Sequence, residues 1–110
     1  MPERIQLRRT KGWRKPEGAI VVARPTKWGN PFSVFEYGEI AVIMFENLLA
    51  WGDEGGFHPY PEPGQLQRLS DHRERILTDI EELRGRDLAC WCSLDQPCHA
   101  DVLLEIANAE

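Results

Sequence analysis

Residues 87–101 read Asp-Leu-Ala-Cys-Trp-Cys-Ser-Leu-Asp-Gln-Pro-Cys-His-Ala-Asp. The stretch predicts a short buried strand over 88–92, a tight loop, and the first turn of a helix that begins near Pro97. All three cysteines of the chain lie in it, together with one of the three histidines. We therefore expect this strand and helix start to organise the fold and any functional site.

The rest of the chain predicts two further strands and two further helices. Residues 5–7 alternate in polarity and predict an edge strand, whereas 19–23 is a continuous apolar run that predicts a central strand beside 88–92. Residues 38–51 and 66–84 carry apolar residues at three- and four-residue steps, which is typical of helices. The first of these helices is expected to turn five residues inward: Ile40, Ile43, Met44, Leu48 and Trp51.

The order β-β-α-α-β-α predicts a single α/β domain over residues 1–110, with Rossmann-like local topology and a central, mostly parallel sheet. In such sheets, ligands bind at the carboxyl ends of the strands. Two strand ends carry unusual residues here, at Arg24–Phe32 and at Cys90–His99. We therefore expect a ligand to lie between these two segments.

The composition is that of an ordinary globular protein, with 42% hydrophobic and 28% charged residues. No apolar run approaches the roughly 18 residues that span a bilayer, and no apolar signal region follows the first residues. We expect a cytoplasmic protein without membrane association. Its cysteines should then be reduced, and an odd count of three argues against a complete disulfide framework.

Charge is distributed unevenly along the chain. Residues 1–33 hold eight basic and two acidic residues, whereas residues 34–110 hold five basic and sixteen acidic residues. A basic segment on a chain of net charge −5 favours a local anionic ligand over wholesale coating of nucleic acid. The alternative is a solvated basic face that pairs with the acidic part of the folded chain.

Cys98 and His99 are the candidate catalytic pair. Cys98 stands where a helix should start, and the free amides and helix dipole there lower the pKa of a thiol and favour its thiolate. His99 is adjacent and could shuttle a proton, which is the arrangement of an activated nucleophile. The alternative is that Cys98 is a small, buried and inert apolar residue.

Cys90, Cys92 and Cys98 are the candidate metal ligands. Side chains alternate along a strand, so Cys90 and Cys92 should point to one face. A tetrahedral zinc ion would need a fourth ligand, for which His99, His58 and His72 are available. The spacing Cys-x-Cys-x5-Cys-His matches no common zinc ribbon or finger, so the sequence alone favours no metal while leaving zinc open.

The loop at 24–32 supplies the candidate anion ligands. Arg24 offers a fork for phosphate or carboxylate, Lys27 adds a point charge, and Asn30 could fix orientation. Trp28 and Phe32 offer faces on which a base could stack. The alternative is that the aromatic residues plug the core while Arg24 pairs with an internal acid.

The basic residues around Trp13 offer a second anionic surface: Arg8, Arg9, Lys11, Arg14 and Lys15. Basic residues with an interleaved aromatic can hold nucleic acid. An isoelectric point near 5.2 argues against a dedicated nucleic-acid binder. We count Arg9 among the ligand-binding candidates and expect His72 to be a surface residue.

Four segments together resemble a known family: Arg-Arg-Thr-Lys-Gly-Trp at 8–13, Ala-Arg-Pro-Thr-Lys-Trp-Gly-Asn-Pro-Phe at 23–32, Cys-Trp-Cys at 90–92, and Pro-Cys-His-Ala-Asp-Val-Leu-Leu at 97–104. The family is the bacterial and phage family called domain of unknown function 4326. The resemblance covers nearly the whole chain. It implies a small bacterial or phage cytosolic α/β domain, and it brings no assigned activity.

Two functions follow as hypotheses. In the first, a small anionic, nucleotide-like ligand binds between Arg24–Phe32 and Cys92–His99 and undergoes transfer or hydrolysis. In the second, the chain is a non-catalytic binding module for nucleic acid or a partner protein, with or without structural zinc. The sequence leaves open whether the protein is an enzyme.

Overall fold

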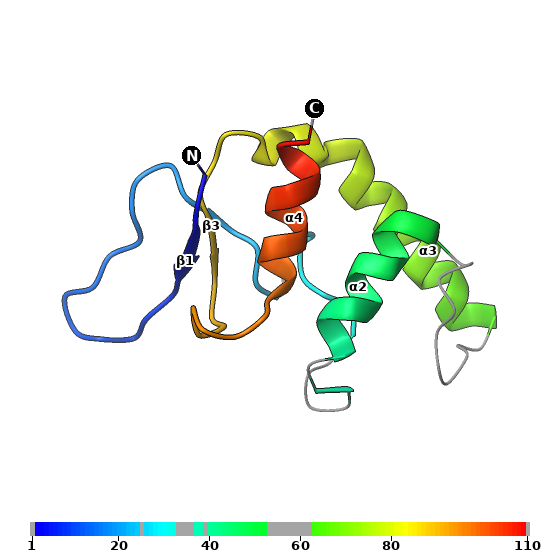
Figure 1. Ribbon diagram of the computed structural model, residues 1–110, viewed down its shortest axis with the longest axis horizontal. Coiled ribbons are helices and arrows are strands. Elements are labelled where there is room, and N and C mark those ends of the chain that lie inside the picture. Colours follow the sequence, from blue (N-terminus) through cyan, green and yellow to red (C-terminus); the bar gives the residue numbers. More distant parts are fainter. Residues whose placement is uncertain (1, 25, 33–36, 39, 53–62, 110) are drawn as a thin grey trace.

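The computed structural model describes residues 2–24, 26–32, 37–38, 40–52 and 63–109, except for the side chain of Pro63. The elements are, in chain order, β1 (Arg4–Gln6), β2 (Ile20–Val21), α2 (Ile40–Trp51), α3 (Pro63–Asp79), the 3-10 helix η2 (Ile80–Leu83), β3 (Leu88–Cys90) and α4 (His99–Ala107) (Figure 1). These elements form a small α/β fold with a parallel sheet of three strands. The predicted fold class is therefore confirmed, whereas the Rossmann-like topology stays a prediction.

The sheet has the strand order β1-β3-β2, and β3 pairs in parallel with both neighbours. Ala89 of β3 lies opposite Ile5 of β1 and Val21 of β2. The predicted edge strand β1 is confirmed, and 19–23 does neighbour 88–92. The prediction that 19–23 lies in the middle is wrong, because β2 forms the other edge of the described sheet. An apolar run indicates covered faces, but it does not indicate whether both edges of the strand are paired.

The strand β3 and the helix α4 form the centre of the core. Leu88 and Ala89 of β3 and Leu103 of α4 are fully buried. Figure 1 shows α4 between the strands and the other helices, and it contacts β1 and β3 as well as α2 and η2. The first turn of α4 is thereby held close to the carboxyl end of β3.

The helix predicted over 66–84 is observed, with a different start and end. It begins earlier, at Pro63, and narrows after Asp79 into the 3-10 helix η2. Gly85 follows with a φ of 75°, a left-handed conformation that glycine adopts without a Cβ clash and that commonly ends helices. Among the described residues, no helix has the length and apolar character needed to cross a membrane.

The inward face of α2 differs from the prediction. The buried residues are Ala41, Met44, Phe45, Leu48 and Leu49. Ile40, Ile43 and Trp51 were expected inside but are 58%, 55% and 66% exposed. Most residues of this helix are apolar, so apolar side chains surround its axis and their spacing does not identify one buried stripe.

Because the three strands are parallel, their carboxyl ends meet at one edge of the sheet. The pairing extends past the strands, since Leu7 N donates to Cys90 O at 2.8 Å and Val22 N donates to Ala89 O at 2.8 Å. The basic loop after β1, the Arg24–Phe32 loop after β2 and the cysteine loop after β3 therefore all leave from this edge.

Candidate functional site

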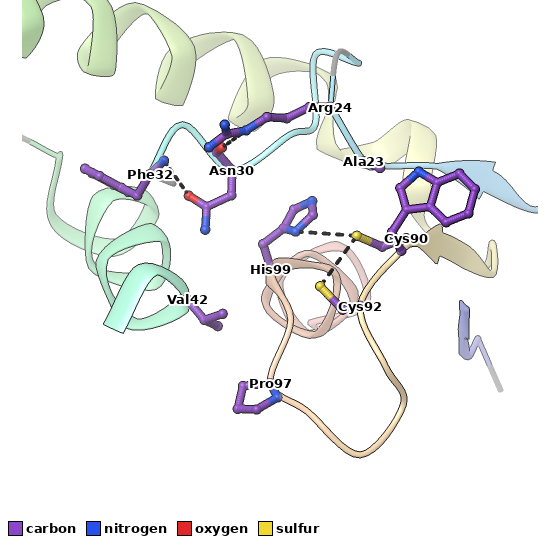
Figure 2. Close-up of a pocket in the computed structure, with 10 residues that line it drawn as sticks. Ala23, Arg24, Asn30, Phe32, Val42, Cys90, Cys92, Pro97 and His99 are labelled. Atoms are coloured by element: carbon purple, nitrogen blue, oxygen red, sulfur yellow. Dashed lines mark hydrogen bonds between the residues drawn. The ribbon is translucent and has the colours of Figure 1, made fainter. Parts of the chain in front are cut away.

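The three cysteines gather where β3 ends and α4 begins. Their sulfur atoms all lie within 4.8 Å of one another. Cys90 Sγ is 3.8 Å from Cys92 Sγ, a contact that is marked in Figure 2. All three are free thiols, with Cys90 and Cys98 buried and Cys92 half-buried. Cys98 is the N-cap of α4, as the sequence predicts. The cluster could hold a metal ion, which the cysteine spacing did not favour.

His99 brings a ring nitrogen close to two of the three sulfurs, those of Cys98 and Cys90. Its ring is buried, and Nε2 lies 2.7 Å from the backbone oxygen of Val22. A carbonyl oxygen can only accept, so Nε2 carries a hydrogen. In the neutral ring, Nδ1 then presents a lone pair. Nδ1 lies 3.6 Å from Cys98 Sγ and 4.0 Å from Cys90 Sγ. The side chain of Phe45 packs edge-on against the ring and fixes its plane.

The pKa values of the three thiols shift in different directions. Hydrogen bonds from the Cys92 and Cys98 thiols lower the pKa of Cys90 to about 3, so Cys90 is the first thiolate of the cluster. The contact with Cys90 raises the pKa of Cys92, which keeps its proton. For Cys98, the contact with Cys90 raises the pKa, but hydrogen bonds from Cys92 and the helix start outweigh it and the pKa falls. Cys90 is thus the thiol of this cluster that ionises most readily.

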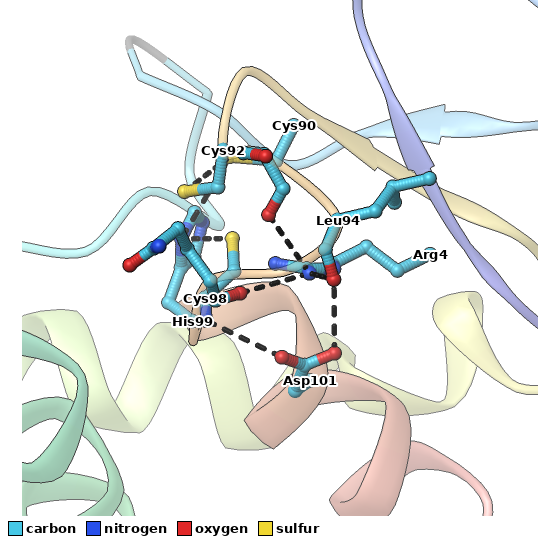
Figure 3. Close-up of polar contacts among 9 residues, drawn as sticks. Arg4, Cys90, Cys92, Leu94, Cys98, His99 and Asp101 are labelled. Atoms are coloured by element: carbon cyan, nitrogen blue, oxygen red, sulfur yellow. Dashed lines mark hydrogen bonds and ion pairs between the residues drawn. The ribbon is translucent and has the colours of Figure 1, made fainter.

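The loop between Cys92 and Cys98 is held by Arg4, a residue that the sequence did not single out. Arg4 Nη2 donates to the backbone oxygens of Ser93, Leu94 and Gln96 at 3.1, 2.8 and 2.9 Å (Figure 3). Its Nε lies 3.5 Å from Asp101 Oδ1, and the side chain is only 8% exposed. An arginine in a three-residue edge strand carries no sequence signal for this role.

Asp101 connects this guanidinium to the start of α4. Its Oδ2 accepts a hydrogen bond from Cys98 N at 3.2 Å, and its own N donates to Cys98 O at 3.0 Å. The Cys98 sulfur also accepts from the Asp101 amide in a capping box. The helix cap therefore holds Cys98 in place at the start of α4.

The Arg24–Phe32 loop is anchored by its own side chains. Trp28 is 4% exposed and Asn30 is 7% exposed. Asn30 Nδ2 donates to Ala41 O at 3.0 Å, and its Oδ1 accepts from Phe32 N at 2.9 Å. These contacts agree with the alternative in which the aromatic residues of the loop plug the core. The ligand-binding roles of Trp28 and Asn30 stay predictions.

The two cations of this loop have different surroundings. Lys27 Nζ lies 2.9 Å from Asp79 Oδ2 and 3.0 Å from Glu82 Oε2, and the hydrogen bond to Asp79 contributes most to raising the pKa of Lys27. Arg24 Nε donates to the backbone oxygen of Asn30 at 2.8 Å. Arg24 has no acidic partner among the residues that the structure describes, so the expected internal acid is not observed there.

A cavity of about 270 Å³ lies between the two predicted segments. Arg24, Asn30 and Phe32 line it from one side, and residues of the cysteine loop and helix start line it from the other (Figure 2). Its lining is mainly apolar, and Arg24 is the one cation among the described lining residues. Cys90, Cys92 and His99 face this cavity, whereas Cys98 is fully buried and does not line it.

Two other predicted residues lie elsewhere. Arg9 stacks on the exposed ring of Trp91, with Cζ 4.9 Å from the ring centroid. His72 was expected to be a surface residue, and it is half-buried. Its Nε2 lies 2.8 Å from Gly29 O, so it supports the Arg24–Phe32 loop. His72 is not a member of the sulfur cluster. His58, the other proposed fourth ligand, lies outside the described residues.

Comparison with known proteins gives one match. The model of a family described as a domain of unknown function, DUF4326, matches residues 5–109. No curated protein and no solved structure matches the chain.

Proposed function

We propose that this chain, which belongs to the DUF4326 family, binds one zinc ion through the clustered thiols of Cys90, Cys92 and Cys98. His99, whose Nδ1 lies beside Cys98 and Cys90, supplies the fourth ligand. The observation that carries the proposal is the approach of three sulfurs and one imidazole lone pair at the end of β3. Tetrahedral zinc, with Zn–S near 2.3 Å and Zn–N near 2.0–2.1 Å, sets S···S at about 3.8 Å and S···N at about 3.6 Å. The corresponding distances here are 3.8 Å between Cys90 and Cys92, and 3.6 and 4.0 Å from Nδ1 to two sulfurs.

The surroundings of the cluster support the same proposal. A zinc-binding histidine usually donates its other ring N–H to a backbone carbonyl or carboxylate, and His99 Nε2 faces Val22 O in that way. Three thiolates and an imidazole suit zinc better than harder cations such as magnesium. Four protein ligands leave no open coordination position, so this zinc would stabilise the fold rather than activate water.

The experiment is metal analysis of the purified, reduced protein. We expect one zinc per chain, and a cobalt-substituted protein with the intense sulfur-to-metal absorption of a thiolate site. Cys92→Ser and His99→Asn should each lower the metal content, while His72→Asn, a matched change at a histidine outside the cluster, should not. A reduced protein that takes up no zinc or cobalt, with wild type and Cys92→Ser equally stable in added zinc, would end the proposal.

A second candidate is the predicted small anionic ligand. The observation that favours it is the cavity between the two segments where we expected the ligand, because Arg24 is among its lining residues. At about 270 Å³ it suits one ring or one phosphoryl sugar rather than a whole dinucleotide. Of the predicted pair for transfer or hydrolysis, His99 lines this cavity but Cys98 does not. A Cys98 thiolate bound to zinc would also lose its role as a nucleophile, so catalysis by this pair requires an empty zinc site.

Thermal unfolding tests the second candidate. Phosphate or a mononucleotide in hundredfold excess over its dissociation constant stabilises the fold by about 2.7 kcal/mol. We expect Arg24→Ala to remove that stabilisation while zinc content stays unchanged. Chloride at matched ionic strength controls for screening. If no phosphate compound raises the melting temperature above this control, the anion site is refuted and the zinc proposal stands alone.

A further inference from the structure

The loop between β1 and β2 carries a concentrated positive charge. Residues 8–17 contain one acidic residue, Glu17, and five basic ones, all of them exposed: Arg8, Arg9, Lys11, Arg14 and Lys15. Other cations are engaged, as Lys27 is with two carboxylates and Arg4 with Asp101. None of the five loop cations has an acidic partner among the residues that the structure describes.

This loop is anchored to the core. Trp13 is half-buried and packs against the main core cluster. Its amide closes a turn on Thr10 O at 3.0 Å, and Gly12 within that turn has a φ of 86°. The cations are therefore presented from a fixed turn, which reduces the entropy lost when a ligand binds them.

A chain of contacts joins the basic loop to the cavity. Arg9 lies over the Trp91 ring, which is 47% exposed, and Trp91 also lines the cavity together with Arg24. All three strand ends point to this edge of the sheet. Lys15 Nζ donates to Ala19 O, and the other loop cations have no acidic partner among the described residues. The edge thus combines these cations with the Arg9–Trp91 stack and with a small pocket that contains Arg24.

We propose that this edge, which consists of residues 8–15, Trp91 and Arg24, binds single-stranded nucleic acid. The loop cations contact successive phosphates, and an unpaired base stacks at Trp91. A terminal base or phosphoryl sugar enters the cavity beside Arg24. An exposed aromatic side chain can stack on unpaired bases of any sequence. In duplex DNA the faces of the bases are stacked on one another and are not available for this contact. The rest of the chain has eleven more acidic than basic groups beyond residue 33, so repulsion confines the nucleic acid to this edge.

The test is fluorescence anisotropy of a labelled single-stranded oligonucleotide with the zinc-loaded full chain. We expect binding that weakens between about 50 and 200 mM salt because phosphate contacts release counterions. Arg8→Ala/Arg14→Ala should weaken binding about tenfold or more and flatten the salt dependence. Arg68→Ala/Arg75→Ala removes the same charge from exposed positions on α3 and should have little effect.

Variants of Trp91 distinguish base stacking from charge attraction in the same binding assay. Trp91→Ala should weaken binding by about fivefold or more, and Trp91→Phe should restore most of it, with zinc content and melting temperature as folding controls. Four results would overturn the proposal: no binding at low salt, equal losses in the two double variants, duplex bound as tightly as single strand, or Trp91→Ala without effect while polyglutamate competes fully. The last result would mean that the edge recognises an acidic polypeptide by charge alone.

Discussion

Arg4→Met provides the sharpest test of how the cysteine loop is built. Arg4 Nη2 has two hydrogens and lies near three backbone oxygens, so we count two hydrogen bonds from a charged donor. Each contributes about 1.5–3 kcal/mol, which gives about 3–6 kcal/mol in total. The contact with Asp101 adds at most about 1 kcal/mol, because that carboxylate is 53% exposed. Methionine keeps the aliphatic volume, so the loss should come from the polar contacts.

Urea unfolding of the zinc-loaded and chelator-treated protein measures this loss. We expect Arg4→Met to lower the free energy of unfolding by about 3–6 kcal/mol, a large share of the 5–15 kcal/mol typical of a domain. The free energy of unfolding of Arg4→Lys, which keeps the charge, should lie between those of Arg4→Met and wild type. Zinc should also bind more weakly, because the loop that positions Cys92 and Cys98 is no longer held.

Arg86→Met is the matched control. Arg86 also donates to a backbone oxygen, that of Gly18 at 3.4 Å, but it is exposed. Its loss should cost less than about 1 kcal/mol. The reasoning about Arg4 is refuted if Arg4→Met costs no more than this control and leaves the zinc affinity unchanged.

Three further predictions concern the loop anchor, the thiols and the exposed helix face. Asn30→Ala removes two buried hydrogen bonds, to Ala41 and Phe32, and should cost about 2–4 kcal/mol in urea unfolding; a cost below about 1 kcal/mol contradicts the anchoring role. The pKa of Cys90 is about 3 in the folded protein, below the value of about 8.5 for a thiol in the unfolded chain. The Cys90 thiolate therefore stabilises the metal-free fold fully above about pH 8.5, and this stabilisation is lost as the pH falls toward 3. The difference in unfolding free energy between metal-free wild type and Cys90→Ser should therefore shrink on acidification, and a constant difference rejects the shifted pKa. Trp51→Ser should change stability by no more than about 0.5 kcal/mol, since Trp51 is 66% exposed; a larger loss means that its ring is covered.

The strand–loop–helix unit at 87–107 could be read from sequence because each of its signals is local. The apolar run predicts β3, and the Pro-Cys-His-Ala-Asp segment predicts a helix start that the structure places at Cys98 and His99. The position of the cavity followed from one further rule, that parallel strands end at one edge.

The features that sequence could not supply depend on tertiary contacts. Arg4 reaches backbone oxygens near the other end of the chain, and no spacing rule connects it to them. His72 bonds to Gly29 across the helix–loop contact, although its charged neighbours made it look exposed. The face of α2 was misjudged because its apolar residues surround the helix, and only the packing of the other elements selects Phe45 over Ile43.

The contacts of Arg4 and His99 with residues distant in sequence determine when the cysteine loop can fold. Arg4 and the Gln96 oxygen that it binds are 92 residues apart, and His99 and Val22 are 77 apart. Arg4 is synthesised well before its acceptors, so the cysteine loop lacks this support until residues 93–96 have been made. Contacts this distant in sequence form late and slow the folding of small domains. Binding of a metal ion to the cysteines in this geometry would therefore report that Arg4 has already reached the cysteine loop.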